Sequence, residues 1–113
     1  MLTYGRGKVP LNLDKNEKIH CVISLGYGKN TGVKHHNKEI NEILNHTGSK
    51  PMWVVRAVYD CLLAPTAINQ QRFQIICENG KVSIEKRGKG FCLDLDLGIV
   101  KSHFHEITGI KLV

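Results

Sequence analysis

The stretch "MWVVRAVYDCLLAPTAINQQRFQIICENGKVSIEK", residues 52–86, decides the fold of this chain. Residues 52–63 carry only two charges, which lie four positions apart and would share one narrow stripe of a helix. We therefore predict a helix that is buried nearly all round. Residues 73–78 and 81–86 are rich in β-branched and aromatic side chains and flank an Asn-Gly pair, a strong signal for a two-residue hairpin turn. The stretch predicts a helix, a loop and a β-hairpin in that order.

Two further elements are predicted upstream of this stretch. Residues 19–25 form an apolar run that suits a buried strand, and a glycine follows it. Residues 37–48, "NKEINEILNHTG", place three apolar side chains on one helical face, with Asn37 as a candidate cap. This spacing predicts a short surface helix over 37–48. Residues 1–17 hold glycines, a proline and mixed polar residues, and we predict an irregular lead-in there.

The end of the chain predicts one more helix and the start of a strand. Residues 94–109, "DLDLGIVKSHFHEITG", contain an acidic start, a helical body and a terminal glycine. We expect Asp94 or Asp96 to open this helix and Gly109 to close it. Residues 110–113 are predicted to begin a further strand.

The length of the chain limits its organisation. With 113 residues it forms one small domain or half-domain, residues 1–113. An apolar helix and a buried strand need cover on several sides, and a chain this short has few elements to provide it. We therefore expect a second copy of the chain or a complementary half-domain to supply the rest.

Localisation is predicted from what the sequence lacks. No run approaches the roughly 20 apolar residues that a membrane-spanning helix needs. The first ten residues, "MLTYGRGKVP", contain no hydrophobic signal region. We predict a cytoplasmic chain with no membrane partner.

The net charge of +6 does not by itself indicate nucleic acid. The lysines are scattered, and the seven aromatic residues (one Trp, three Tyr and three Phe) do not interleave with them as a stacking platform would. We predict a diffuse basic surface and no nucleic-acid partner. The same field would attract an anionic ligand such as a flavin phosphate or a nicotinamide dinucleotide.

Cysteines and histidines do not form a metal-binding pattern. The four cysteines lie far apart and none belongs to a CxxC pair, so we expect reduced structural thiols. His103 and His105 are two positions apart, a spacing that points them in different directions on a helix. The sequence predicts no metal site.

The loop "APTAINQQRF", residues 64–73, separates the apolar helix from the hairpin. Pro65 cannot continue a helix and biases Ala64 toward an extended conformation, which stiffens the loop. Thr66 and three following amide side chains add uncharged donors and acceptors, which suit a heteroaromatic ring edge such as the pyrimidine portion of a flavin. An ordinary helix-to-strand turn with local side-chain caps is the alternative reading.

Three segments resemble motifs of the nitroreductase superfamily of FMN-dependent oxidoreductases. "APTAINQQRF" is similar to its APSxxNxQPW segment, with Thr66 for the serine, Arg72 for the proline and Phe73 for the tryptophan. "ISLGYGK", residues 23–29, resembles its LGYP strand exit, and "LDLGIVKSHF", residues 95–104, resembles its DxG helix. This order of motifs resembles the second half of the subgroup in which two half-domains are fused. The family's arginine-rich RRSxR segment, which holds the FMN phosphate, has no counterpart in the sequence.

The resemblance implies a fold and an activity. The fold class would be α+β, a three-layer nitroreductase-like fold or half of it, with a mixed, largely antiparallel sheet flanked by helices. The function would be that of an FMN-dependent oxidoreductase, which passes hydride from NAD(P)H through the flavin to a nitroaromatic, quinone or similar small-molecule electron acceptor. No catalytic acid or nucleophile is required of the protein. The partner would be another copy, giving a homo-oligomer such as a dimer, or a complementary half-domain.

The same resemblance implies the site residues. Pro65, Thr66, Asn69 and Gln71 match the cofactor-binding positions of the family. Asp96 lies in the second matched helix, where packing and capping are the expected role. An alternative remains open: a truncated or diverged module that keeps the fold and binds a flavin or a partner chain without turnover.

Overall fold

The computed structural model describes residues 11–19, 22–23 and 25–112, and divides the chain into two units, Met1–Val33 and Lys34–Val113. In the first unit the described part of the predicted lead-in, residues 11–17, has one turn at 15–16 and no helix or strand, and Val22 is an isolated bridge residue. The predicted buried strand over 19–25 is wrong for its described residues, because Ile23 and Leu25 are 69% and 94% exposed. An apolar run forms a buried strand only where it can pair with a neighbouring strand and pack against a core. Residues 20, 21 and 24 of that prediction lie outside the described part.

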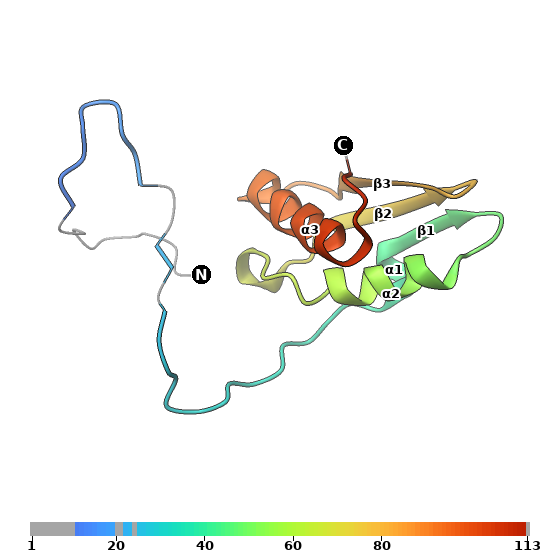
Figure 1. The fold of residues 1–113 in the computed structure, drawn as a ribbon, viewed down its shortest axis with the longest axis horizontal. Coiled ribbons are helices and arrows are strands. Elements are labelled where there is room, and N and C mark those ends of the chain that lie inside the picture. The colour runs from blue at the N-terminus through green and yellow to red at the C-terminus, as the bar shows by residue number, and fades with distance from the viewer. Residues whose placement is uncertain (1–10, 20–21, 24, 113) are drawn as a thin grey trace. The chain divides into compact units, whose positions relative to one another are not determined.

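The second unit is an α+β fold with a three-stranded mixed sheet (Figure 1). Its elements are, in chain order, α1 (Ile40–Ile43), β1 (Leu44–Thr47), α2 (Met52–Cys61), the 3-10 turn η1 (Ala67–Asn69), β2 (Phe73–Glu78), β3 (Lys81–Lys86) and α3 (Leu93–Thr108). The strand order is β1-β2-β3, with β1 parallel to β2 and β2 antiparallel to β3. The predicted α+β fold with a mixed sheet and helices is confirmed.

The hairpin forms with the predicted bounds. Phe73 pairs with Lys86 at one end and Glu78 with Lys81 at the other, so the two strands are in register over their full length. Asn79 and Gly80 have φ values of 50° and 78°, the left-handed backbone that a two-residue turn of this type requires.

The predicted helix over 37–48 is wrong in its second half. Only Ile40–Ile43 are helical, and residues 44–47 form β1 in parallel register with residues 75–78 of β2. Leu44 is buried beside its partner Ile75, so the tertiary contact with β2 overrides the local helical spacing. Glu39, and not Asn37, precedes the helical turn, and its N–H donates to the carboxylate of Glu42 at 3.0 Å.

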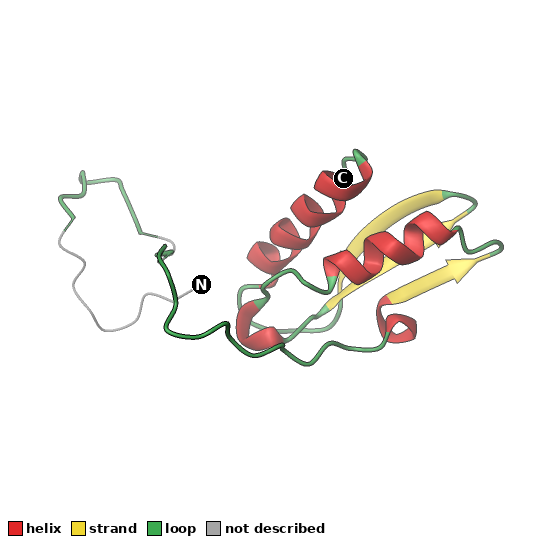
Figure 2. Cartoon of the chain, turned by 60° about the horizontal axis from the view of Figure 1, so that its bottom comes forward, coloured by secondary structure: helices red, strands yellow, loops and turns green. Residues whose placement is uncertain are grey.

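The core lies between the sheet and the two longer helices. Side chains of β2 alternate between buried and partly exposed positions, as one covered face requires. Figure 2 shows α2 and α3 on one side of the sheet. Their buried residues pack against the same face of β2 and β3 in a single cluster that includes Val58, Phe73, Ile75, Ile84 and Phe104. Within the described residues, therefore, the fold has a helical layer and a sheet layer.

Helix α2 buries one face only. Val54, Ala57, Val58 and Cys61 are fully buried, whereas Met52 and Tyr59 are 66% and 56% exposed. The expected burial nearly all round is therefore not reached within this chain. Burial raises the pKa of the Cys61 thiol to about 12, with the nearby Asp60 carboxylate as a second, smaller cause. This thiol is therefore neutral at physiological pH and packs as a small apolar group.

The chain ends on helix α3 and a short irregular segment. Cys92, in a left-handed conformation, precedes the helix, and Gly109, with φ 70°, ends it as predicted. Asp94 and Asp96 both lie in the first turn and neither is the N-cap residue. The predicted strand over 110–113 is absent from its described residues 110–112, although Leu112 is buried. Among the residues placed by the structure, no helix is long and apolar enough to cross a membrane.

Candidate functional site

Residues 64–72, which we call the amide loop, join α2 to β2. The N–H of Asn69 donates to the carbonyl of Thr66 at 3.0 Å, and the N–H of Gln70 donates to the carbonyl of Ala67 at 2.9 Å. Pro65 has no N–H and cannot extend α2. The chain therefore leaves the helix and closes a tight turn before it enters the sheet.

Three residues of the amide loop adopt left-handed backbone without being glycine. The φ values are 45° for Ile68, 54° for Asn69 and 43° for Gln71. This conformation brings Cβ close to the backbone and is particularly unfavourable for a β-branched residue such as Ile68. Strain of this kind persists only where the surroundings over-determine the conformation, and it clusters at functional sites.

Two of the four predicted site residues face outward. Pro65 is exposed, and Asn69 is partly exposed at the end of η1. The Nδ2 group of Asn69 donates to the backbone carbonyl of His36 at 2.6 Å. No hydrogen bond from a described residue reaches its Oδ1. Asn69 therefore presents a hydrogen-bond acceptor beside the exposed side chain of Ile68.

The other two predicted site residues are turned into the protein. Thr66 is buried, and its Oγ1 accepts the backbone N–H of Gln71 at 3.0 Å. Gln71 is 1% exposed, and its side-chain amide is engaged by Asn37, Lys38 and Leu62. The side chains of Thr66 and Gln71 therefore hold the amide loop through hydrogen bonds inside the protein. Their direct contact with a ligand stays a prediction.

Asp96 supports the amide loop from helix α3. Its side chain is buried. The carboxylate accepts hydrogen bonds from the backbone N–H of Ala67 at 2.8 Å and from Nε2 of Gln70 at 2.6 Å. Hydrogen bonds to a charged acceptor are stronger than neutral ones. From the sequence, Asp96 was expected to pack and cap, and Gln70 was one of the amides expected to offer donors and acceptors to a ring edge. The one available signal was an aspartate among apolar residues on a helix, which needs a buried partner.

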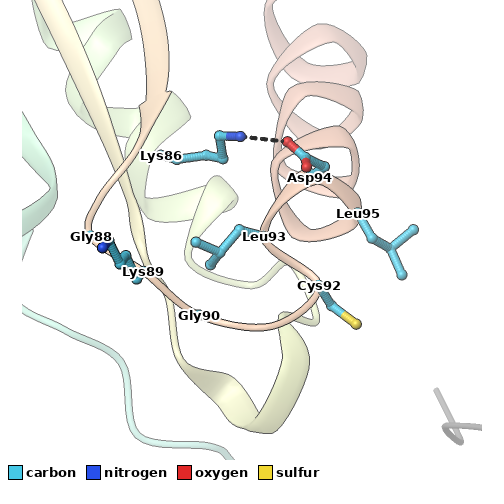
Figure 3. Close-up of a pocket in the computed structure, with 8 residues that line it drawn as sticks. All are labelled: Lys86, Gly88, Lys89, Gly90, Cys92, Leu93, Asp94 and Leu95. Carbon is cyan, nitrogen blue, oxygen red and sulfur yellow. Dashed lines mark hydrogen bonds and ion pairs between the residues drawn. The ribbon is translucent and has the colours of Figure 1, made fainter.

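A pocket of about 360 Å³ lies where β3 meets the start of α3 (Figure 3). Lys86 and Asp94 face each other across it at 2.7 Å, and Lys89 and the exposed thiol of Cys92 also line it. The side chains of Lys86 and Asp94 are 47% and 88% exposed, so this ion pair contributes little to stability.

Gly90 joins this pocket to the amide loop. An added Cβ at Gly90 would lie 2.8 Å from Oε1 of Gln70 and 3.3 Å from Nη1 of Arg72. Arg72, where the family motif has proline, is exposed and donates from Nη1 to the carbonyl of Lys89. The glycine therefore permits a close approach of the pocket backbone to the side chains of Gln70 and Arg72.

The described side chains do not suggest a metal site. No group of three or more His, Cys, Asp or Glu residues in that part of the chain could hold a metal ion. The amide loop offers neutral hydrogen-bonding groups, which are suited to a polar ring edge.

Comparisons with known proteins point to one family. The model of a family described as "Putative TM nitroreductase" matches residues 1–107. A crystal structure described as that of "a putative nitroreductase" from Thermotoga maritima is 26% identical, with a TM-score of 0.61. The match covers 73% of the present chain and 36% of that chain, so this chain spans about a third of the length of that relative. No curated protein matches the chain.

Proposed function

This chain belongs to the nitroreductase family, and we propose that it is an FMN-dependent oxidoreductase, or one half of one, that binds the flavin ring with its amide loop. When bound, FMN would supply the hydride-transfer chemistry, so the protein needs to bind and orient the ring and to tune its electronics. The observation that carries the proposal is Asn69, a partly exposed residue on a strained loop, whose Oδ1 receives no hydrogen bond from a described residue.

The geometry of Asn69 fits one edge of a flavin. One N–H of its Nδ2 donates to the His36 carbonyl, and no described residue donates a hydrogen bond to its Oδ1, so Oδ1 is the acceptor that we propose for a ligand. The pyrimidine portion of a flavin carries one N–H between two carbonyl groups, and this N–H is the complementary donor. We propose that Asn69 binds this N–H. Pro65 and Ile68, both exposed in the same loop, would flank the ring.

Thr66 and Gln71 serve the same site from inside. Both are buried and hydrogen-bonded within the chain, so their proposed part in cofactor binding is to keep the loop backbone in its left-handed conformation. Fixed backbone groups aimed at a ring edge cost no reorganisation when charge develops there. NAD(P)H as reductant, and a nitroaromatic, quinone or similar compound as acceptor, are proposed from family membership alone.

A partner is proposed for the exposed side of α2. Met52, Tyr59 and Leu63 are each more than half exposed on or next to this helix. The match covers 36% of the relative from Thermotoga maritima, so the rest of that protein is nearly twice as long as the matched part. We propose that a second copy or a complementary half-domain covers this side. A monomer at all micromolar concentrations in light scattering would contradict the proposal.

The test of flavin binding is the Asn69→Leu variant. Leucine keeps a similar volume and removes the acceptor, which leaves a ring N–H unpaired at a cost of about 1–3 kcal/mol. We expect flavin affinity, measured by fluorescence titration, to fall roughly tenfold to a hundredfold.

The matched control is Gln74→Leu, which likewise replaces an amide side chain with leucine, on the partly exposed side of β2. It should alter flavin affinity much less. Equal affinity in the wild type and in Asn69→Leu, with both folded by circular dichroism, would refute a flavin contact at this loop. Flavin binding without oxidation of NADH or NADPH in the presence of an acceptor would favour the alternative, a module without turnover.

A further inference from the structure

Residues 34–38, "KHHNK", cross the amide loop and form a segment that we call the strap. From the sequence, Asn37 and Lys38 are the predicted start of a helix, and residues 34–36 have no assigned role. The structure places it beside η1, where Figure 2 shows the chain running past that turn on its way to α1. Asn37 and Lys38 are partly buried there, whereas residues 34–36 are exposed.

Five hydrogen bonds join the strap to residues 62–71. His35 Nε2 bonds the carbonyl of Leu62 at 3.2 Å, and Asn69 Nδ2 donates to the carbonyl of His36 at 2.6 Å. The three other bonds end on Gln71. Its Nε2 donates to Oδ1 of Asn37 at 3.0 Å, its Oε1 accepts the N–H of Lys38 at 2.8 Å, and its carbonyl accepts Nζ of Lys38 at 3.0 Å.

Gln71 transmits this contact to the rest of the amide loop. Its side-chain amide uses both N–H groups, one on Asn37 and one on Leu62. Its backbone N–H donates to Thr66, which closes the loop around Asn69. The backbone of Gln71 is itself left-handed, with φ 43°. The strap therefore supplies external bonds that a strained, non-glycine backbone needs in order to persist.

We propose that the strap positions the amide loop for its ligand, with Asn37 and Lys38 as positioning residues that act through Gln71. This inference rests on the proposed flavin site and extends it to a segment outside the matched motif. In this arrangement Lys38 does not touch the ligand. It holds the Gln71 carbonyl with its ammonium group and thereby fixes the backbone on which Asn69 sits.

The variant Lys38→Met tests the proposal because it removes the ammonium group and keeps an unbranched side chain of similar length. In the flavin-free full chain, we expect the backbone amides of Asn69 and Gln70 to exchange with solvent about tenfold faster. Flavin affinity should fall about tenfold, which is the usual effect of losing a hydrogen bond to a charged donor. The visible spectrum of the bound flavin should also shift, because its ring edge meets a less fixed partner.

Two further variants separate positioning from general stability. Lys34→Met is the matched control, because Lys34 is exposed in the same strap and takes part in none of the five hydrogen bonds to residues 62–71. Lys38→Arg should restore exchange protection, affinity and spectrum, because it returns a cationic donor.

Each outcome decides the proposal. Unchanged exchange in Lys38→Met would overturn it, and so would faster exchange with unchanged flavin affinity. If no variant and not even the wild type binds flavin, the proposed function fails. In that case exchange in the flavin-free chain still decides whether the strap holds the loop.

Discussion

The hairpin of residues 73–86 and the amide loop of residues 64–72 adjoin in sequence, yet different forces hold them. The hairpin is defined by its own ladder of strand pairs, its Asn-Gly turn and the burial of one face against the helices. The amide loop has a short turn of its own and depends on bonds from the strap and from Asp96 on α3.

The same backbone conformation occurs in both regions and shows the difference. In the hairpin, the left-handed turn positions are taken by Asn79 and Gly80, residues that accept this conformation at low cost. In the amide loop, Ile68 and Gln71 adopt it. In a turn that is stabilised locally, the residues favour the left-handed backbone. In a loop that is stabilised by contacts with distant residues, side chains that disfavour this backbone can still occupy it.

The largest effect is expected from Phe73→Ala. Phe73 is 2% exposed at the start of β2 and belongs to the core cluster. Removal of a buried aromatic side chain typically lowers the free energy of unfolding by about 3–5 kcal/mol. Urea denaturation should show this loss in a single transition that includes the amide loop. A loop that melts separately from the hairpin in this variant would show that the two regions are independent of each other.

A smaller and more local effect is expected from Asp96→Ala. The change leaves the N–H of Ala67 and the side chain of Gln70 without their acceptor, at a cost of roughly 1.5–3 kcal/mol. Amide hydrogen exchange should accelerate at Ala67 and Gln70 more than along β2 and β3. The control is Asp94→Ala, two residues away, which removes only an exposed ion pair with Lys86 and should be nearly neutral. Equal acceleration in loop and hairpin would remove the distinction between the two regions.

The smallest and most specific expected effect is that Gly80→Ala and Ile68→Gly change the thermal stability in opposite directions. Gly80→Ala places a Cβ at φ 78° in the hairpin turn and should lower the melting temperature by an amount that corresponds to about 1 kcal/mol. Ile68→Gly relieves the same kind of strain at φ 45° on an 82% exposed residue and should raise it, by roughly 0.5–1 kcal/mol. Thermal unfolding of both variants and of the wild type measures the two shifts in melting temperature. A loss of stability in Ile68→Gly would mean that the isoleucine side chain makes contacts that outweigh its backbone strain.

The site could be predicted only in outline from its sequence. The APTAINQQRF resemblance pointed to the amide loop and to Asn69, which is partly exposed and which we propose as a ligand contact. It could not show that Thr66 and Gln71 face inward, nor that Asp96 and the strap hold them. The direction of a side chain depends on which distant groups it can reach in the folded protein. The spacing of residues within one segment does not predict those contacts.

The sequence by itself determined the hairpin with its bounds and the presence and approximate extent of α2 and α3. Asn-Gly turns, strand composition and a terminal glycine act within a few residues of one another, so they are readable in order along the chain. Only the tertiary structure decided that residues 44–47 become a strand and that the strap clamps the amide loop. The bonds of Asp96 and Lys38 to the loop join residues 26 to 33 positions apart. Such bonds form because folding brings those groups together, and their geometry cannot be seen in either segment alone.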